Sequence, residues 1–431
     1  MNKSNGSVTF FSSIQWFFFI FANTIVVPIS IASVFQLDAN VVEAMIRNSL
    51  LFTGVACIFQ GWIGHKLPIM EGHSGLLWGV ILNLGISASS MGMSLTEVGG
   101  GIITGTLLAC GVTLVFVLFN WIHIIQAIFR PMVISVYLFL LSFQLIIIFF
   151  KGMLKITDDG TIDVAISLYS VVIAITVSIL KMKGNQVISN FSILLGLLIG
   201  WVGFALLFPS ELTEVTNSSA FSLGLFPLGT PNFEVSIIII SFLAGLINLT
   251  NTMASIKAGA DLLKEKRTKK HIRRSMTITS LFTMIGTCFG LVSFTPFTST
   301  LGFLQSTRIY DRKPFLLGGG ILALIGIIPM ISSFLATMPI TVGNAVLFVA
   351  YLQLFGTAYS SVNGMQFNSN TIFRIAVPLL TGVSLMTLSP EIFNSLPVVL
   401  RPFLSNGLMM GVIISIILER VVDWSKFEVK R

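Results

Sequence analysis

The stretch LPIMEGHSGLLWG, Leu67 to Gly79, places the tightest constraint on how this chain can fold. It lies where a membrane helix is expected, yet Pro68, Glu71 and His73 interrupt its first half. An unpaired backbone N–H or C=O in hydrocarbon costs several kcal/mol, so such a segment survives only when it is buried in protein or lines a cavity. The stretch therefore predicts a broken helix at a transport site.

Composition places the whole chain in a membrane. Of its 431 residues, 54% are apolar and only 10% are charged. Apolar runs of about 17 to 25 residues recur from end to end, and we expect about fourteen spans centred near residues 22, 55, 76, 108, 140, 171, 199, 245, 283, 302, 324, 349, 381 and 409. The first run begins at Phe10 and is too long for a cleaved signal peptide. The sequence thus predicts an all-α polytopic membrane protein, with residues 1–431 as one transmembrane domain.

The positions of the charges predict the orientation. With the N-terminus in the cytoplasm, the 25 Lys and Arg residues fall on the cytoplasmic side with the exceptions of Arg47, Lys151, Lys155 and Arg401. Both termini are then cytoplasmic, in the cell membrane. The basic loop from Lys264 to Arg274 is interpreted as an orientation signal beside anionic lipid headgroups, and no nucleic-acid partner is expected.

No enzymatic or metal chemistry is expected. The three cysteines fall inside predicted helices, which argues against disulfides. The four histidines show no metal-ligand spacing, and no cofactor is expected. Glu71 is the only carboxylate that we expect inside the bilayer, which leaves no acidic pair for catalysis.

An internal repeat divides the chain. The matched pairs, all at one spacing, are Asn23–Thr24 with Asn251–Thr252, Pro68 with Pro296, and Glu71 with Ser299. An odd number of spans, seven, separates the two copies, so the second is inverted relative to the first. We expect repeats at about 10–210 and 233–420, with the substrate near the midplane between discontinuous helices.

The repeat places a second broken helix at Phe294 to Gly302, FTPFTSTLG. Pro296 interrupts regular helix hydrogen bonding, and the hydroxyl-bearing Thr298, Ser299 and Thr300 follow it. Each break can lead into a half-helix whose N-terminal amides offer donors to a carbonyl or an anion, with Ser74 and Gly75 at this position in the first break. The alternative is a pair of proline kinks packed between neighbouring helices.

A polar stripe marks the predicted eighth span. Asn248, Asn251, Thr252 and Ser255 follow the i, i+3, i+4, i+7 spacing of one helix face. Amides can donate and accept along the edge of a planar heterocycle, whereas the alternative role is contact between helices. Gln15 belongs to a weaker stripe in the first span, with both roles open.

Two ionisable side chains lie in the first break. An intramembrane carboxylate is functional by default, so Glu71 is the candidate for proton coupling; the alternative is a structural acceptor for backbone amides. His73 projects to the same side of an extended segment and is a candidate substrate ligand. Tyr351 and Gln353 in the predicted twelfth span could reach the cavity.

These motifs, in this order, resemble the xanthine/uracil permease family, the second nucleobase:cation symporter family, and most closely its purine permease branch. The matching segments are Gln15–Trp16, Asn23–Thr24 with Pro28, IMEGHSGLLWG from Ile69, GLINLTNT from Gly245, FTPFTSTLG with Thr307–Arg308, and RPFLSNGL from Arg401. The resemblance covers nearly the whole chain.

The resemblance implies fourteen spans in two inverted seven-span repeats. Spans 1–4 and 8–11 form a core domain and spans 5–7 and 12–14 a gate domain, with short antiparallel strands in the broken spans three and ten. It implies uptake of a nucleobase held between spans three, eight and ten, coupled to a cation, H⁺ rather than Na⁺. Family members often dimerise through the gate domain.

This chain departs from the family pattern at its acids. Asn248 stands where well-studied members have a glutamate, and Ser299 where they have an acid or a glutamine. Gln15–Trp16 replaces a Gln–His pair, and Thr252 corresponds to a histidine of the uracil permeases. An asparagine cannot change charge, so proton coupling would have to use Glu71.

The sequence thus predicts a secondary active transporter that imports a purine or related nucleobase. One alternative is an anion carrier on the same fold, although such carriers usually append a cytoplasmic domain for which the tail from Glu419 to Arg431 is too short. The other is a nucleobase sensor that does not transport, which the missing acids suggest.

Overall fold

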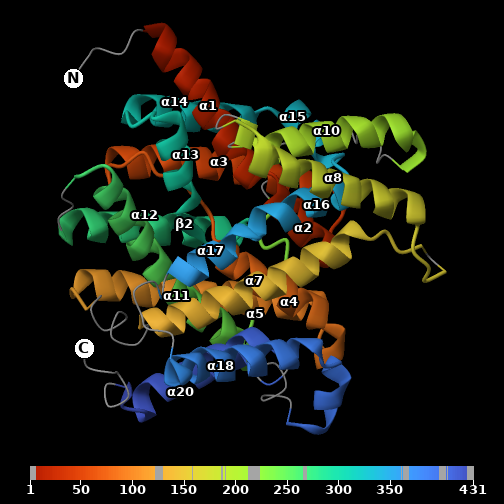
Figure 1. Cartoon of the computed structure of the whole chain (residues 1–431), viewed down its shortest axis with the longest axis vertical. Helices are drawn as coiled ribbons and strands as arrows, with labels where there is room; N and C mark the ends of the chain where they lie inside the picture. The colour runs from red at the N-terminus through yellow and green to blue at the C-terminus, as the bar shows by residue number, and fades with distance from the viewer. Residues whose placement is uncertain are drawn as a thin grey trace.

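The computed structural model describes residues 6–121, 130–157, 159–185, 188–189, 191–211, 224–265, 269–360, 362, 368–397, 404 and 406–424. These residues are mostly helical (Figure 1). The helices run roughly side by side, as expected for a polytopic membrane protein (Figure 1).

The helices pack in two groups. The first group holds α1 (Gly6–Thr24), α2 (Val26–Val34), α3 (Ala39–Trp62), α4 (Gly75–Ser87), α5 (Leu95–Leu118), α11 (Val235–Leu262), α12 (Lys269–Cys288), α13 (Ser299–Thr307), α14 (Arg312–Ile327) and α15 (Pro329–Ala336). The second group holds α7 (Pro131–Met153), α8 (Val164–Lys183), α10 (Ser192–Leu207), α16 (Ile340–Tyr351), α17 (Gln353–Ser360), α18 (Ser369–Thr387) and α20 (Gly407–Val421). Three short 3₁₀ segments are η1 (Ser89–Met91), η2 (Pro209–Glu211) and η3 (Pro390–Ser395).

Each packing group combines two parts of the chain that are distant in sequence. In the first group α3 packs on α14 and α5 packs on α11 and α12, while in the second α7 packs on α16, α18 and α20. The groups meet where α4 contacts α7 and α2 contacts α16.

Among the described residues, six helices are long and apolar enough to cross a membrane. They become seven if α14 and α15, which bend by 88° at their junction, count as one span. Four shorter apolar segments add to these, within α4, α10, α16 and α18. The chain is therefore an integral membrane protein by composition and helix length, and fourteen spans stay an expectation.

A two-stranded antiparallel sheet lies inside the first group, at the two stretches where the resemblance implies strands. Strand β1 (Glu71–His73) pairs with β2 (Phe294–Pro296), with Gly72 opposite Thr295. Two further backbone bonds extend the pairing, from Ser74 N to the Ser293 carbonyl at 2.7 Å and from Phe297 N to the Met70 carbonyl at 2.8 Å. The pairing satisfies backbone groups of two buried segments that are not helical.

The strand register differs from the alignment of the repeats drawn from the sequence. Gly72 and Thr295 form the central pair, so a two-fold axis through the sheet relates Glu71 to Phe294. The sequence alignment instead matched Glu71 with Ser299, which begins the helix after β2. The two prolines of that alignment also lie at different places relative to the strands, because Pro68 precedes β1 whereas Pro296 ends β2.

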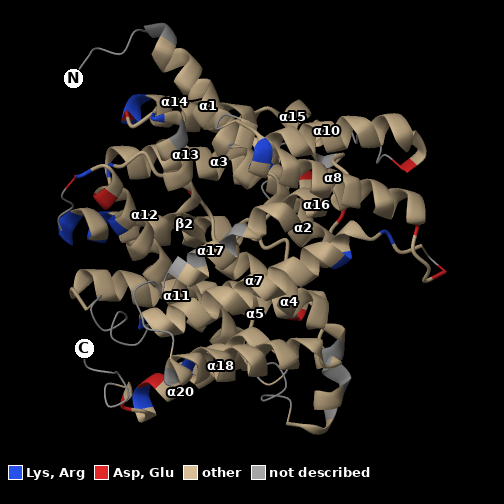
Figure 2. Cartoon of the chain, viewed as in Figure 1, with Lys and Arg blue, Asp and Glu red and all other residues tan. Residues whose placement is uncertain are grey.

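Charge separates the two ends of the helices. In Figure 2, ribbon segments of Lys and Arg residues lie at the left-hand ends of α12, α14 and α20. Segments of acidic residues lie at the right-hand ends of α8 and α10 in the same view (Figure 2). This asymmetry is the pattern that the positive-inside rule produces.

Glycines allow helices of the first group to pack closely. A Cβ on Gly54 of α3 would lie 2.5 Å from the Gly319 carbonyl of α14, and a Cβ on Gly99 of α5 would lie 1.9 Å from the Leu228 carbonyl. Five glycines of the two triple-glycine stretches therefore serve packing, namely Gly99, Gly100, Gly101, Gly318 and Gly319, as small residues commonly do between membrane helices. A Cβ on the sixth, Gly320, would meet nothing within 4 Å.

We predict that Gly54→Ala destabilises the protein. Its added methyl group would meet the backbone of α14, and overpacking of this kind costs about 1–3 kcal/mol. Thermal unfolding in detergent measures the effect. The matched control is Gly320→Ala, where a Cβ meets nothing within 4 Å. Equal melting temperatures for the two variants would contradict the prediction.

Candidate functional site

Two short helices begin directly after the paired strands. Helix α4 starts at Gly75 and α13 at Ser299. Ser74 caps α4: its hydroxyl accepts from the Leu77 amide at 3.5 Å. The N-terminal ends of both helices carry partial positive charge and amide donors, so polar or anionic ligands are favoured beside them.

Asn248 of α11 connects the two breaks. Its amide oxygen accepts from the Ser74 hydroxyl at 2.8 Å, and its amide nitrogen donates to the Phe294 carbonyl at 3.0 Å. The side chain is 5% exposed, so both ends of the amide are committed to protein partners. Asn248 therefore holds the first break and the second break in register.

The remaining stripe residues contact the second break. Asn251 donates weakly to the Thr295 hydroxyl at 3.5 Å, and Thr252 lies 3.3 Å from the same hydroxyl. Ser255 and Thr298 share a hydrogen bond of 2.8 Å. The stripe thus bonds to β2 and to the residue before α13. Asn251 is half-buried, and its long bond leaves it the most available of these side chains to a ligand.

Other predicted ligands lie at varied places around the breaks. Ser299 is exposed at the start of α13, whereas Thr300 is buried and accepts from the Met70 amide at 3.3 Å. Gly75 is half-buried at the start of α4. Gln15 is half-buried on α1, and among the described residues no hydrogen bond joins it to the breaks. The side chain of Gln353 lies outside the described residues.

The neighbour of the first break from the second packing group is aromatic. A Cβ on Gly75 would lie 3.2 Å from the Tyr351 hydroxyl, so that hydroxyl lies against the start of α4. The Tyr351 ring lies 5.4 Å from the rings of Trp78 and Phe149. Trp78 also donates to the Ser30 hydroxyl at 2.8 Å. Tyr351 therefore joins the two packing groups beside the breaks, as its sequence position suggested it could.

The Glu71 side chain lies in a hydrogen-bonded network with α3 and α12. One carboxyl oxygen accepts from the Thr279 hydroxyl at 2.6 Å. Gln60 donates to that hydroxyl at 2.9 Å, and Ser275 donates to Gln60 at 2.9 Å. The network leads along α12 toward its basic first turns. The other Glu71 oxygen has no hydrogen-bond partner among the described residues, and the side chain is fully buried.

His73 projects to the same side of β1 as Glu71 and also packs against α3. Its Nδ1 lies 3.2 Å from the Val292 carbonyl, and its Nε2 lies 2.5 Å from the Ser49 hydroxyl. Because a carbonyl can only accept, Nδ1 donates, which leaves Nε2 of a neutral ring to accept from Ser49. The ring is 1% exposed and committed on both nitrogens in this conformation.

The structure thus separates residues that the sequence placed in one site. Five of these residues lie together where α4 and α13 begin: Ser74, Asn248, Asn251, Thr252 and Thr298. Glu71 and His73 occupy the opposite face of β1, since Gly72 between them points toward Met70 and Phe297.

The sequence analysis missed several participants. The sequence offers one signal that could have identified Thr279 and Gln60 as partners of Glu71: each is a polar side chain within a predicted span. The expectation that Glu71 is the only buried carboxylate was wrong, because Glu43 is 2% and Glu419 is 3% exposed. Glu43 stands one helical turn before the buried Arg47, and Glu419 pairs with Arg374. Opposite charges lower the cost of burial.

No cluster of three or more His, Cys, Asp or Glu side chains occurs among the described residues. All three cysteines are free, which confirms that they form no disulfide. The polar side chains beside the starts of α4 and α13 are amides and hydroxyls, groups that can donate and accept hydrogen bonds.

Comparison with known proteins gives a family model and relatives that are similar in sequence. A family model described as "Permease family", Xan_ur_permease, matches residues 7–391. The chain is 31% identical to "Putative purine permease YwdJ" of Bacillus subtilis, over 96% of each protein. It is 23% identical to "Uric acid permease PucJ" of the same organism, over 96% of this chain and 93% of that protein.

The fold also matches a solved structure. The transmembrane domain of the cyanobacterial bicarbonate transporter BicA aligns with a TM-score of 0.61 and 12% identity, covering 97% of this chain and 98% of that chain. At this identity the likeness concerns the fold alone.

We predict that Thr279→Val destabilises the protein by about 1–3 kcal/mol, because the buried Glu71 carboxyl loses its donor. Thermal unfolding in detergent measures the change. Thr277→Val is the control on the same helix, since the Thr277 hydroxyl donates to the Arg273 carbonyl one turn earlier. A control that loses as much stability as Thr279→Val would show that the Glu71 contact is not responsible.

Proposed function

This chain belongs to the xanthine/uracil permease family, and from that membership we propose that it imports a purine or related nucleobase by proton symport. Membership itself makes the chain an integral membrane transporter and not an enzyme. The nature of the substrate, the coupling ion and the direction are the proposed part. The names of the relatives, a purine permease and a uric acid permease, support a purine substrate.

The observation that carries the proposal is the arrangement of neutral donors and acceptors at the starts of α4 and α13. A purine presents both donors and acceptors along its ring edge. Such an edge can be matched by the side-chain amide of Asn251, the hydroxyls of Thr298 and Ser299, and the backbone amides of the breaks. Asn248 fixes their relative positions through Ser74 and Phe294.

The two packing groups provide the moving parts of the proposed mechanism. We assign the first group to the core domain and the second to the gate domain of a fourteen-span, inverted-repeat transporter. Rocking one group against the other would expose the breaks to each side of the membrane in turn. The Tyr351 contact with the start of α4 would then open and close during transport. Cytoplasmic termini, the cell membrane and a homodimer through the gate domain belong to this proposal.

Glu71 is the proposed coupling group. A charged carboxylate in a non-polar interior is costly. Binding or release of a proton by Glu71 would therefore change the relative energies of two conformations that differ in how far they bury its side chain. The network through Thr279 and Gln60 ties its state to α12 and α3. A proton needs only one carboxyl, whereas Na⁺ needs several oxygen ligands, and this favours H⁺.

We predict that purified protein in proteoliposomes accumulates one purine base above equilibrium only when the outside is acidic. With one proton per base, each unit of pH gradient supports accumulation of up to about tenfold. The measurement is uptake of radiolabelled adenine, guanine, hypoxanthine, xanthine, uracil and urate with and without the gradient. Equilibration without accumulation would contradict proton symport, and absence of flux for every base would contradict nucleobase transport.

We predict that Asn251→Ala raises the KM for the transported base about tenfold without a change in melting temperature, because one hydrogen bond to the ligand is lost. Thr250→Ala is the control, since its hydroxyl bonds within its own helix, to the Ile247 carbonyl. Asn248→Ala should lower both transport and stability, as it links the two breaks. An unchanged KM in Asn251→Ala would remove Asn251 from the ligand set.

We predict that Glu71→Gln abolishes gradient-driven accumulation yet retains exchange of labelled for unlabelled base. The amide oxygen of Gln can still accept from Thr279, but the side chain cannot release a proton at this position. Glu97→Gln, at the exposed start of α5, is the matched control and should accumulate normally. Normal accumulation by Glu71→Gln would place proton coupling elsewhere.

Two other functions remain distinguishable in these assays. An anion carrier is favoured by the two helix N-termini beside a neutral Asn248, and it would show anion flux that bases do not inhibit. A sensor is favoured because Asn248 and Ser299 stand where well-studied family members have acids, and it would bind a base without flux.

A further inference from the structure

A basic groove lies at the start of α12, away from the breaks. It is an open groove of about 740 Å³ between the first turns of α12 and the ends of α3 and α5. Its four cationic side chains are Lys269, Lys270, Arg273 and Arg274. The described lining residues include no acid.

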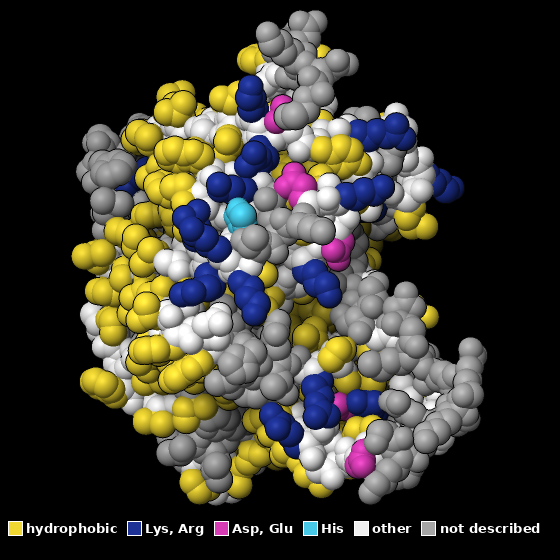
Figure 3. Space-filling model, turned by 90° about the vertical axis from the view of Figure 1, so that its left-hand side faces the viewer, with side chains coloured by type: hydrophobic (Ala, Val, Ile, Leu, Met, Phe, Trp, Pro, Cys, Tyr) yellow, Lys and Arg dark blue, Asp and Glu magenta, His cyan; other side chains and the backbone are white. Residues whose placement is uncertain are grey.

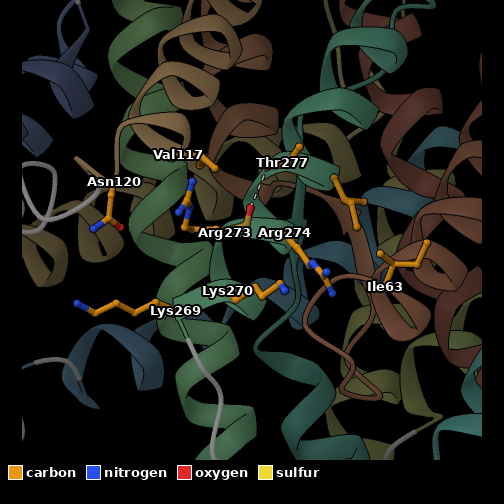
Figure 4. A pocket seen from close by; sticks show the side chains of 9 residues that line it. Ile63, Val117, Asn120, Lys269, Lys270, Arg273, Arg274 and Thr277 are labelled. Carbon is orange, nitrogen blue, oxygen red and sulfur yellow. Dashed lines mark hydrogen bonds between the residues drawn. The ribbon is translucent and has the colours of Figure 1, made fainter.

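The four cations form two like-charged pairs. Lys269 and Arg273 extend toward the end of α5, whereas Lys270 and Arg274 extend toward Ile63 at the end of α3 (Figure 4). Residues four apart on a helix are neighbours, so each pair repels itself unless an anion lies between its members. The positive end of the α12 dipole adds to this potential.

Few protein groups offset these charges. Arg273 donates to the Leu118 carbonyl at 3.3 Å, which ties α12 to the last turn of α5. Among the described residues, no ion pair is formed by Lys269, Lys270 or Arg274. Cations that no described acid compensates, gathered around one open groove, favour a phosphate group as occupant.

The surroundings of the groove are those of a membrane surface. At the end of α3, Trp62 is 65% exposed beside Ile63. At the end of α5, Leu118 is 69%, Phe119 58% and Trp121 45% exposed. Exposed aromatic side chains of this kind mark the level of lipid headgroups. Figure 3 shows Lys and Arg side chains gathered on this face of the molecule, next to exposed hydrophobic side chains.

From this arrangement we propose that the groove binds the phosphate headgroup of an anionic phospholipid, with the acyl chains along the exposed apolar ends of α3 and α5. A soluble phosphate would use the cations but not this apolar surface. The Lys and Arg side chains lie on the face that the positive-inside rule assigns to the cytoplasm, where anionic lipid attracts basic side chains.

The test is binding of phosphatidylglycerol to the full chain in detergent, with Lys270→Gln/Arg274→Gln as the variant. Each basic side chain near an anionic surface contributes about 1 kcal/mol, so the double variant should bind roughly 30-fold more weakly. Arg312→Gln/Lys313→Gln removes two exposed cations at the start of α14 and is the matched control, expected to bind as the unmodified chain does.

Three outcomes would overturn the proposal. Phosphatidylcholine binding as tightly as phosphatidylglycerol would show that net negative charge is not recognised. Inorganic phosphate or glycerophosphoglycerol competing as well as the lipid would identify a site for a soluble phosphate. Equal loss of binding in the control variant would show a diffuse surface charge effect. Melting temperatures of both variants in detergent establish that they fold.

Discussion

The pairing of β1 with β2 is the interaction on which the rest of the structure depends. Both strands are buried inside an apolar protein, where the backbone groups of a non-helical segment must be satisfied. Antiparallel pairing from Met70–Phe297 to Ser74–Ser293 satisfies them with each other. Because the two strands lie far apart in sequence, this pairing also draws α4 and α13 together and creates the place where both helices begin.

In the proposed mechanism, two residues take separate tasks: Asn248 organises the ligand site, and Glu71 couples transport to the proton. Asn248 bridges the two breaks with a neutral amide, and its carbonyl and amino groups are both used by Ser74 and Phe294. Glu71 lies on the other face of β1, against Thr279 and α3. Recognition of a ligand and titration of a carboxyl can therefore occur on opposite faces of one three-residue strand, linked by its backbone.

Helix α12 connects two separate features of the protein. Its first turns carry the basic groove, and Ser275 and Thr279 further along carry the network to Glu71. The same helix thus carries the proposed lipid site at one end and contacts the buried carboxyl near its middle. Its polar character explains why hydropathy alone does not identify it as a spanning helix.

Local signals in the sequence determined the membrane character, the two interrupted stretches, the stripe from Asn248 to Ser255 and the family. Each of these follows from residue types at a spacing that a helix or strand imposes nearby. Only the tertiary structure decided that Glu71 and His73 face α3 and α12, that Gly72 pairs with Thr295, and that Glu43 and Glu419 are buried. A strand presents two equivalent faces, and a local sequence pattern does not say which of them meets α12. That choice depends on contacts with residues such as Thr279, roughly two hundred positions away in the sequence.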